Sequence, residues 1–324
     1  MNQYIIPFEM ATEADHPRMG GKCASLARMI ALGVPVPAGF AVATDAYAAH
    51  LQSSGLENAI KAELAELNTA DVVDEEVKSK AIRNLVIKQP MPAHVEAAIR
   101  AGYLALSPTG DLPVAVRSSA TAEDMPDASF AGQQDTFLWV VGADEVVDCV
   151  RDCWASLFTA RAMSYRKDHQ LGQIEVLMSV AVQTMVDARS AGVALTLDPI
   201  NGDRTKVVID SSWGLGESVV SGEITPDNFI VEKVLMKVLK RKISDKGHEI
   251  VADRVARSTV TRVIEAERRT LPSISDEEVI AVAQLARRLE KAMGCTQDVE
   301  WAFDQVGQLV ALQSRPETIW SQKK

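Results

Sequence analysis

The sequence has few cysteines, no long apolar run and no targeting segment at its start. Its four cysteines are scattered over 324 residues, and Cys149 and Cys153, one helical turn apart, have no histidine or third cysteine nearby to complete a zinc site. No run approaches the ~18 apolar residues of a membrane span. The opening MNQYIIPFEM lacks the basic flank and apolar core of a signal peptide. We therefore expect a cytoplasmic protein that does not enter a membrane.

The sequence also lacks an excess of positive charge. Charged residues make up 24% of the chain, the formal net charge is −10, and no long basic run occurs. A groove for nucleic acid or a face for anionic membranes is therefore not expected. Any anionic ligand has to be held by a local group of cationic side chains.

Several familiar catalytic motifs are missing. There is no Gly-x4-Gly-Lys-Ser/Thr segment, which excludes a P-loop enzyme, and no His-Glu-x-x-His or Gly-x-Ser-x-Gly segment. The stretch GLGESV at residues 214–219 starts like a dinucleotide fingerprint, but Val219 replaces the third glycine. The histidines fall in no recognisable catalytic context, and we interpret each as a surface or helix residue: His16, His50, His94, His169 and His248.

The length and the apolar content predict two sizeable cores and two or three subdomains. The chain is 47% hydrophobic. The residue patterns predict helices at residues 20–32, 144–167 and 274–293, and a mostly helical stretch at 44–105 with breaks near Ser53–Gly55 and Pro90–Pro92. They predict strands at residues 112–117, 135–142, 175–186, 190–199, 205–217 and 228–243, followed by a hairpin at 295–316. This order predicts an α+β fold, with an N-terminal helical region over a mostly antiparallel sheet system. We divide it into residues 1–110, 111–187 and 188–324.

The stretch VAVRSSATAEDMPDASFAGQQDTF combines an arginine, free hydroxyls and small residues. Arg117 directly follows an apolar strand, where its guanidinium is suited to bidentate contact with phosphate oxygens. Residues 128–132 are mostly small, so that their backbone N–H groups can approach an anion. The stretch predicts a phosphate cradle other than a P-loop. The alternative is a tight turn in which Arg117 pairs with Glu123 or Asp124.

The segment GGKCASL places a lysine at the start of a predicted helix. Both Lys22 and the helix N-terminus would attract a phosphate group. Taken alone, the segment favours a solvated lysine in the first helical turn.

The predicted C-terminal hairpin has one polar face. A two-residue turn at Val306 and Gly307 would place Glu300 directly opposite Gln313, with the two side chains about 5 Å apart. A carboxylate and an amide oxygen at that distance suit Mg²⁺, and Arg315 continues on the same face. A three-residue loop with a bulge would shift the register by one and remove the pairing. The alternative is an ordinary hairpin with a solvated polar face.

Four segments, taken in order, resemble a known family. They are GGKCASLARMIALGVPVPAGFAV, VAVRSSATAEDMPDASFAGQQDTFL, GLGESVVSGEITPD and DVEWAFD…LQSRPET. The chain resembles, over essentially its whole length, the N-terminal ATP-binding domain of phosphoenolpyruvate synthases, which pyruvate phosphate dikinase and rifampicin phosphotransferase share. The resemblance implies an ATP-grasp fold, in which ATP and Mg²⁺ lie between two α+β lobes.

The resemblance also implies roles for individual residues. Phosphate contacts would come from Lys22 and Arg117, and the loop of Gly132 would cover the phosphates. Thr136 would contact the nucleotide, and Gln183, Met185 and Val186 would form the adenine hinge. Glu217 would lie near the ribose or the phosphates. Glu300 and Gln313 would bind Mg²⁺, and Arg315 would contact the transferring phosphates. The segment LTLDPINGD departs from the family's usual Phe-Thr-x-x-Pro, and we assign Asp198 no role.

The reaction implied by the resemblance is a dikinase half-reaction. The terminal diphosphoryl group of ATP passes to a histidine, AMP is released, and hydrolysis leaves phosphohistidine and phosphate. The family's Thr-x-Gly-Gly…His segment is absent here, so we expect a separate partner chain that carries the phosphohistidine and acceptor domains, with a small-molecule acceptor bound to that chain.

The resemblance favours the ATP-binding subunit of phenylphosphate synthase, which phosphorylates phenol. An excised domain of phosphoenolpyruvate synthase or of rifampicin phosphotransferase is the alternative. A non-catalytic ATP-binding regulatory subunit, which would release no AMP, and a carboxylate–amine ligase, which would release ADP, are further alternatives.

Overall fold

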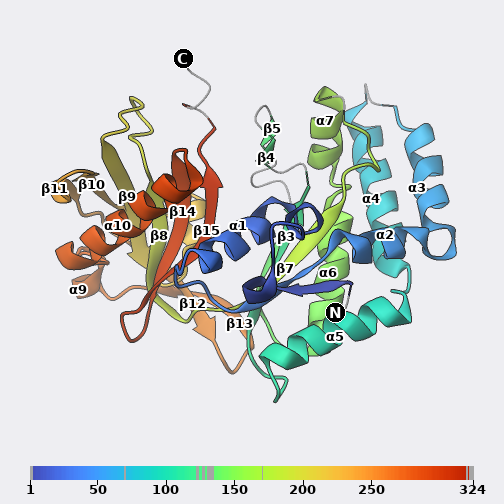
Figure 1. The fold of residues 1–324 in the computed structure, drawn as a ribbon, viewed down its shortest axis with the longest axis horizontal. Coiled ribbons are helices and arrows are strands. Elements are labelled where there is room, and N and C mark those ends of the chain that lie inside the picture. The colour runs from blue at the N-terminus through green and yellow to red at the C-terminus, as the bar shows by residue number, and fades with distance from the viewer. Residues whose placement is uncertain are drawn as a thin grey trace. The chain divides into compact units, whose positions relative to one another are not determined.

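The computed structural model describes residues 3–68, 71–121, 124–125, 128–129, 135–169, 171–318 and 320, with the backbone alone at 124–125 and 128–129. The chain forms two compact units that each combine helices with a sheet (Figure 1). The first comprises Met1–Ala27 and Ala38–Met185, and the second comprises Arg28–Pro37 and Val186–Lys324. The predicted α+β class is confirmed, while the division into three segments stays a prediction.

The first unit is built on a five-stranded sheet. Its strands, in spatial order, are β1 (Ile5–Pro7), β2 (Gly39–Val42), β7 (Met178–Thr184), β3 (Val114–Ala120) and β6 (Thr136–Val140), and every neighbouring pair is antiparallel. The sequence of β7 is a nearly continuous buried run, as expected for a strand near the middle of a covered sheet. Two further strands of two residues each, β4 (Asp124–Met125) and β5 (Ala128–Ser129), pair with each other.

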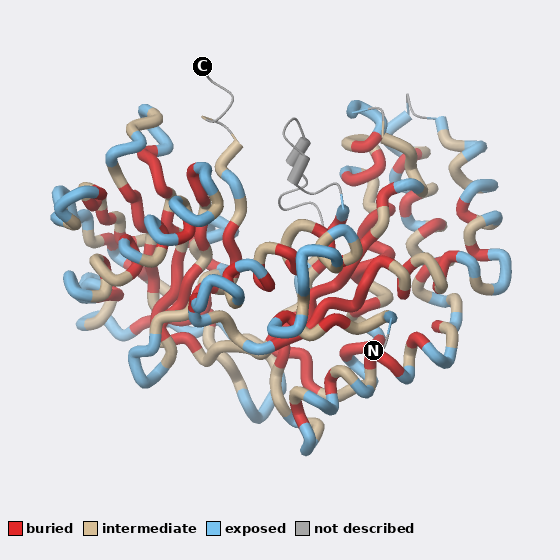
Figure 2. Tube along the Cα trace, viewed as in Figure 1, coloured by how far each residue is buried: buried red, intermediate tan, exposed pale blue. Residues whose placement is uncertain are grey.

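Helices supply the rest of the first unit. They are α1 (Gly20–Ala31), which continues into the second unit, α2 (Thr44–Gln52), α3 (Leu56–Ala65), α4 (Val72–Lys88), α5 (Ala93–Leu106), α6 (Ala143–Ser156) and α7 (Ala160–Asp168), with short 3₁₀ turns η1 (Phe8–Met10), η2 (His16–Arg18) and η3 (Ser53–Gly55). Helices and sheet share one apolar core, and its buried strands stand out in Figure 2.

The predicted single helix at residues 144–167 is wrong in one respect. The apolar stripe of Val146, Val150 and Trp154 is buried as expected, but the helix ends after Ser156 and a second helix, α7, begins at Ala160. The Thr159 side chain accepts a hydrogen bond from the Ala162 N–H at 3.2 Å, which caps the new helix. The apolar stripe continues across this break, so hydrophobic periodicity alone did not reveal it.

The second unit is built on a six-stranded antiparallel sheet. Its spatial order is β11 (Lys237–Lys242), β10 (Asp227–Glu232), β9 (Lys206–Trp213), β8 (Ala188–Leu195), β14 (Gln297–Asp304) and β15 (Leu309–Pro316). The long helix α10 (Asp276–Met293) packs against this sheet. Ser275 and Glu278 form a capping box at its start, and Gly294, with φ of 73°, ends it.

Smaller elements complete the second unit. They are α8 (Glu217–Val220), α9 (Ala266–Arg269) and the hairpin of β12 (His248–Asp253) and β13 (Ser258–Val263), which the sequence patterns did not predict. Among the helices that the structure describes, none combines the length and the apolar character needed to cross a membrane.

Candidate functional site

The start of α1 is fixed to the end of β3. Gly20 has φ of +66°, and its backbone lies so close to the strand that a Cβ atom there would stand 2.1 Å from the Ser119 carbonyl oxygen. The Ser119 hydroxyl accepts from the Cys23 N–H at 3.2 Å and donates to the Met19 carbonyl at 3.0 Å. The glycines of GGKCASL and the serines of VAVRSSA thus form one junction, although about a hundred residues separate them.

This junction brings Lys22 beside the strand that carries Arg117. The Lys22 Nζ donates to the carbonyl oxygen of Ser118, the residue after Arg117, at 3.0 Å. In the sheet register Arg117 stands opposite Thr136 of β6. Lys22 and Arg117 are both half-buried and Thr136 is exposed. Three residues predicted to contact the nucleotide, two of them at its phosphates, therefore come from neighbouring places of the first unit.

Part of the predicted phosphate cradle lies outside the described residues. Gly132 belongs to that part, and so does Glu123, which was the alternative partner of Arg117. The side chain of Asp124, the other alternative partner, is also outside the description. The proposed cover over the phosphates therefore stays a prediction.

The predicted adenine hinge lies at the end of β7. Gln183 is buried and pairs with Ala115 of β3 on one side and with Gly39 of β2 on the other. The N–H group of Met185 donates to the carbonyl of Pro113 at 2.9 Å. The chain leaves the first unit after Met185 and enters the second at Val186. The three hinge residues thus end a strand that is hydrogen-bonded on both edges.

In the second unit, Glu300 of β14 stands opposite Gln313 of β15, as predicted. The predicted two-residue turn is nevertheless wrong. Asp304 donates its N–H to the Gln308 carbonyl at 3.1 Å, so the loop has three residues, 305–307. That loop shifts the register by one, and a bulge beside Glu300, with Leu312 as the extra residue, shifts it back.

One face of the six-stranded sheet carries a polar row. In antiparallel strands, residues that stand directly opposite each other share a face. The successive partners of this row are Gln313, Glu300, Val193, Asp210 and Asn228, one from each of five neighbouring strands. The Asn228 amide donates to the Asp210 carboxylate at 2.8 Å, which orients that carboxylate within the row.

Helix α10 covers the opposite face. Arg241 stands across from Phe229, next to Asn228 in the strand and therefore on the other side of the sheet. Its Nε is 2.7 Å from the Asp276 carboxylate in the first turn of α10. Trp301, which follows Glu300, is fully buried. The polar row therefore lies on the face that α10 leaves uncovered.

Sequence reasoning missed Asp298. It lies two residues before Glu300 on the same face and stands opposite Arg315, whose Nε and Nη2 donate to the Asp298 Oδ2 at 2.9 and 2.7 Å. The Asp298 Oδ1 is buried and has no hydrogen-bond partner among the described residues. Burial raises the pKa of Asp298, and Arg315 opposes that shift. The sequence did carry a signal for this residue: Asp298 and Glu300 are two positions apart in a predicted strand and therefore share a face.

The predicted Glu217 is the first residue of α8 and is exposed. It follows a glycine turn that holds α8 against β8 and β9. Gly214, with φ of +73°, is required there, because a Cβ atom would lie 2.3 Å from the Ile250 carbonyl oxygen. Glu217 thus belongs to the same unit as the polar row.

The predicted residues fall into two sets. The first unit holds Lys22, Arg117, Thr136, Gln183 and Met185, and the second holds Val186, Glu217, Glu300, Gln313 and Arg315. The first set is cationic and hydroxylic, whereas the hairpin offers oxygen ligands from Asp298, Glu300 and Gln313. Over the described ranges, no group of three His, Cys, Asp or Glu side chains is arranged to hold a metal by itself. The hairpin's two carboxylates and one amide suit Mg²⁺ that completes its shell with water and phosphate oxygens.

Comparison with known proteins gives a consistent picture. The family model described as "Pyruvate phosphate dikinase, AMP/ATP-binding domain" matches residues 16–324. The chain is 41% identical to the probable phosphoenolpyruvate synthase of Staphylothermus marinus, over 99% of this chain and 42% of that protein. It is also 41% identical to the phosphoenolpyruvate synthase of Neisseria meningitidis, over 100% of this chain and 43% of that protein. The chain thus spans about two fifths of the length of these relatives.

Among solved structures, D-alanyl-alanine synthetase A from Vibrio cholerae overlaps with 75% of this chain and 54% of its own. The sequence identity is 12% and the TM-score is 0.30, a value too low to support an inference about the fold.

Proposed function

Because the chain belongs to the pyruvate phosphate dikinase AMP/ATP-binding domain family, we propose that it binds Mg·ATP in an ATP-grasp arrangement and transfers the terminal diphosphoryl group to a histidine. AMP is the other product of this transfer. Hydrolysis of the diphosphoryl group then leaves phosphohistidine and phosphate. The chain acts in this proposal as the ATP-binding part of a dikinase-type phosphotransferase.

The observation that carries the proposal is the junction of α1 with β3. It holds the Lys22 ammonium at the backbone carbonyl of Ser118, the residue after Arg117, so a lysine and an arginine come from neighbouring places in the fold without a P-loop. Phosphoryl transfer depends mainly on positioning and on neutralising the charge of the phosphates. We assign this role to Lys22 and Arg117, with Thr136 beside them.

The hairpin supplies the metal half of the proposed site. Asp298, Glu300 and Gln313 would hold Mg²⁺ through their side-chain oxygens, and the ion would supply positive charge that neutralises the phosphates. Arg315 is held by Asp298 and is directed at the phosphates in this proposal. In this proposal the adenine is assigned to residues 183–186 and the ribose side to Glu217.

We place the acceptor histidine on a partner domain outside residues 1–324. Of the chain's own histidines, His50 is fully buried and bonded to the Val86 carbonyl, and His169 is stacked on Tyr165. Neither is placed to receive a diphosphoryl group. The relatives bear the name phosphoenolpyruvate synthase, which supports pyruvate, rather than phenol, as the final small-molecule acceptor.

Product analysis tests the proposal. The chain is incubated with ATP, Mg²⁺ and pyruvate, with and without the histidine-carrying and acceptor domains of a phosphoenolpyruvate synthase, and nucleotides are separated by chromatography. We expect AMP and phosphate, formed only when the histidine domain is present. ADP would instead indicate a ligase or an ordinary kinase, and bound but unchanged ATP would indicate a regulatory subunit.

Variants connect the reaction to the two sets of residues. Arg117→Gln and Glu300→Gln should each lower the rate of AMP formation about 100-fold or more, because each removes a charge that acts on the phosphates or on their metal. Lys88→Gln removes an exposed lysine of α4 and should leave the rate unchanged. Full activity of Arg117→Gln would disprove the proposed phosphate site.

A further inference from the structure

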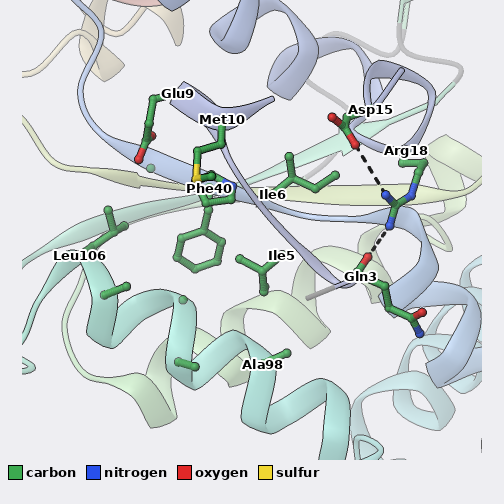
Figure 3. Close-up of a pocket in the computed structure, with 15 residues that line it drawn as sticks. Gln3, Ile5, Ile6, Glu9, Met10, Asp15, Arg18, Phe40, Ala98 and Leu106 are labelled. Carbon is green, nitrogen blue, oxygen red and sulfur yellow. Dashed lines mark hydrogen bonds and ion pairs between the residues drawn. The ribbon is translucent and has the colours of Figure 1, made fainter. Parts of the chain in front are cut away.

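The first unit contains a cavity of about 600 Å³ that includes none of the residues assigned to the nucleotide (Figure 3). It is enclosed by β1 with the adjoining η1, by β2 and by one face of α5. In the close-up, Glu9 lies to the left of Phe40 and Ile5, and Asp15 and Arg18 lie to their right. Its volume is typical of a site for a small organic molecule.

The small side chains of α5 create this cavity. Ala98, Ala101, Gly102 and Ala105 line it at helical spacing, so that they form one face of the helix. At Gly102 the helix comes so close that a Cβ atom would lie 3.1 Å from the Phe40 ring and 3.2 Å from Ile5. Elsewhere along this face an alanine stands where a larger apolar side chain would close the space.

The interior of the cavity is apolar. Phe40 is 2% exposed and Ile6 is 7% exposed, so both form part of the folded core as well as the cavity wall. Met10, in contrast, is 62% exposed at the mouth. The apolar surface that a guest would remove from water belongs to the exposed lining residues Met10, Ala101 and Ala105.

The mouth of the cavity is acidic. Glu9 is exposed, and the described part of the chain offers it neither an ion pair nor a hydrogen bond. At the other side, the Arg18 guanidinium is 2.7 Å from the Asp45 carboxylate and 3.7 Å from that of Asp15. Among the described residues that line the cavity, the cation Arg18 is therefore matched by two carboxylates, and the Glu9 charge is left uncompensated.

We propose that this cavity binds an amphiphilic organic cation, with its apolar body against the exposed lining residues Met10, Ala101 and Ala105 and its ammonium group at the Glu9 carboxylate. The charge at the mouth favours a cation over an anion of the same shape. The proposal does not depend on the nucleotide function, because its residues and its ligand are different.

Isothermal titration of the whole chain with 2-phenylethylamine tests this inference, with 2-phenylethanol and 3-phenylpropanoate as neutral and anionic counterparts. We expect saturable binding of the amine, about threefold weaker binding of the alcohol, as for an exposed ion pair, and the weakest binding for the acid. No saturable amine binding below ~5 mM, or equal affinity for all three compounds, would overturn the proposal.

Paired variants locate the bound amine. Ala105→Phe fills the cavity from an exposed position of α5 and should weaken amine binding about tenfold or more, whereas Ala97→Phe, exposed on the same helix but outside the cavity, should not. Ala101→Phe is a second filling variant if the first fails to fold. Unchanged binding by a folded filling variant would overturn the proposal.

The charge is tested separately. Glu9→Gln should weaken the amine about threefold and leave the alcohol unchanged, because it removes one exposed ion pair and keeps the shape of the side chain. Glu13→Gln removes an exposed carboxylate away from the cavity and is the matched control. Equal effects of Glu9→Gln and Glu13→Gln on amine binding would contradict the assigned position of the ammonium group.

Discussion

One ion pair of the second unit is buried and another is exposed, so their contributions to stability can be measured separately. The Lys246 ammonium lies 2.6 Å from the Asp227 carboxylate, and both side chains are fully buried. Asp227 also accepts from the Ser273 N–H at 2.8 Å. The pair of Arg241 and Asp276 lies at the surface, with the side chains 46% and 52% exposed.

Removal of one carboxylate should therefore have unequal effects. Asp227→Asn leaves a buried lysine without its counter-charge and should lower the free energy of unfolding by about 3–5 kcal/mol. Asp276→Asn should lower it by about 1 kcal/mol or less, because water screens the exposed pair. Urea unfolding of the two variants measures the difference, and equal losses would show that the buried pair is not a structural anchor.

His50 makes stability depend on pH. It is fully buried among helices of the first unit, its Nε2 lies 3.1 Å from the Val86 carbonyl, and burial lowers its pKa. In the unfolded chain the His50 side chain therefore binds a proton near pH 6.5, whereas in the folded chain it binds a proton only at a lower pH. Stability should be unaffected by this group above that pH and should fall as the pH drops below it.

The expected slope is at most about 1.4 kcal/mol per pH unit. Urea unfolding at pH 7.5, 6.5 and 5.5 measures it, and His50→Gln should flatten the dependence. His94→Gln alters an exposed histidine and serves as the control. A pH dependence of equal steepness in His50→Gln and in the unmodified chain would contradict the assignment to His50.

At the scale of elements, the contact of α1 with β3 can be tested by a pair of glycines. Gly20 and Gly55 have similar positive φ angles, 66° and 76°, but a Cβ atom at Gly55 would have no neighbour within 4 Å. Gly55→Ala should cost about 1–2 kcal/mol, the strain of a left-handed alanine. Gly20→Ala should cost clearly more, because the helix has to move away from Ser119.

Thermal unfolding compares the two glycine variants, and ATP titration adds a second measurement. We expect weaker ATP binding for Gly20→Ala alone, since the displaced helix carries Lys22. If Gly20→Ala bound ATP as Gly55→Ala does, the position of α1 would not matter for the nucleotide.

The accuracy of the sequence prediction differed between elements for physical reasons. Strongly periodic segments such as α10 were predicted almost to the residue, because burial of one face sets their pattern. The hairpin of β12 and β13 was missed, because most of its residues are at least partly exposed and show no clear apolar alternation. A half-solvated ribbon leaves little hydrophobic signal in its sequence.

Individual residues of the candidate site could be predicted from their local sequence. Their arrangement in space could not, because it depends on contacts between distant segments. Lys22 and Arg117 stand out individually, but their meeting depends on Gly20 fitting against Ser119, which no local pattern reveals. The pairing of Glu300 with Gln313 was predicted from a turn that does not form. The longer loop and the later bulge cancelled each other, so the correct pairing followed from an incorrect turn.

At the scale of the whole molecule, the chain passes between the two units three times. Residues 28–37 belong to the second unit although the segments before and after them belong to the first. Within the second unit the Ala311 N–H donates to the Pro35 carbonyl at 2.8 Å, and Arg288 donates to the Leu32 carbonyl. The second unit is therefore incomplete without a segment that lies far earlier in the sequence.

A chain cut between Met185 and Val186 should consequently stay associated. Co-expressed fragments 1–185 and 186–324 should co-purify, because the first fragment carries residues 28–37 of the second unit. Replacing 28–37 by a Gly/Ser linker of equal length should weaken the association about tenfold or more, which size-exclusion chromatography at several concentrations measures. Co-purification that is indifferent to the linker would mean that other contacts hold the fragments together.

The backbone of Gly39 has a consequence for both proposed ligands. Gly39 lines the cavity beside α5 and also pairs with Gln183, and a Cβ atom on it would lie 2.5 Å from the Val182 carbonyl oxygen. A guest that pushes β2 away from α5 would therefore press on the strand assigned to adenine. In that case the two binding equilibria are coupled. Thermodynamic linkage then requires that the guest change the affinity for ATP by the same factor as ATP changes the affinity for the guest.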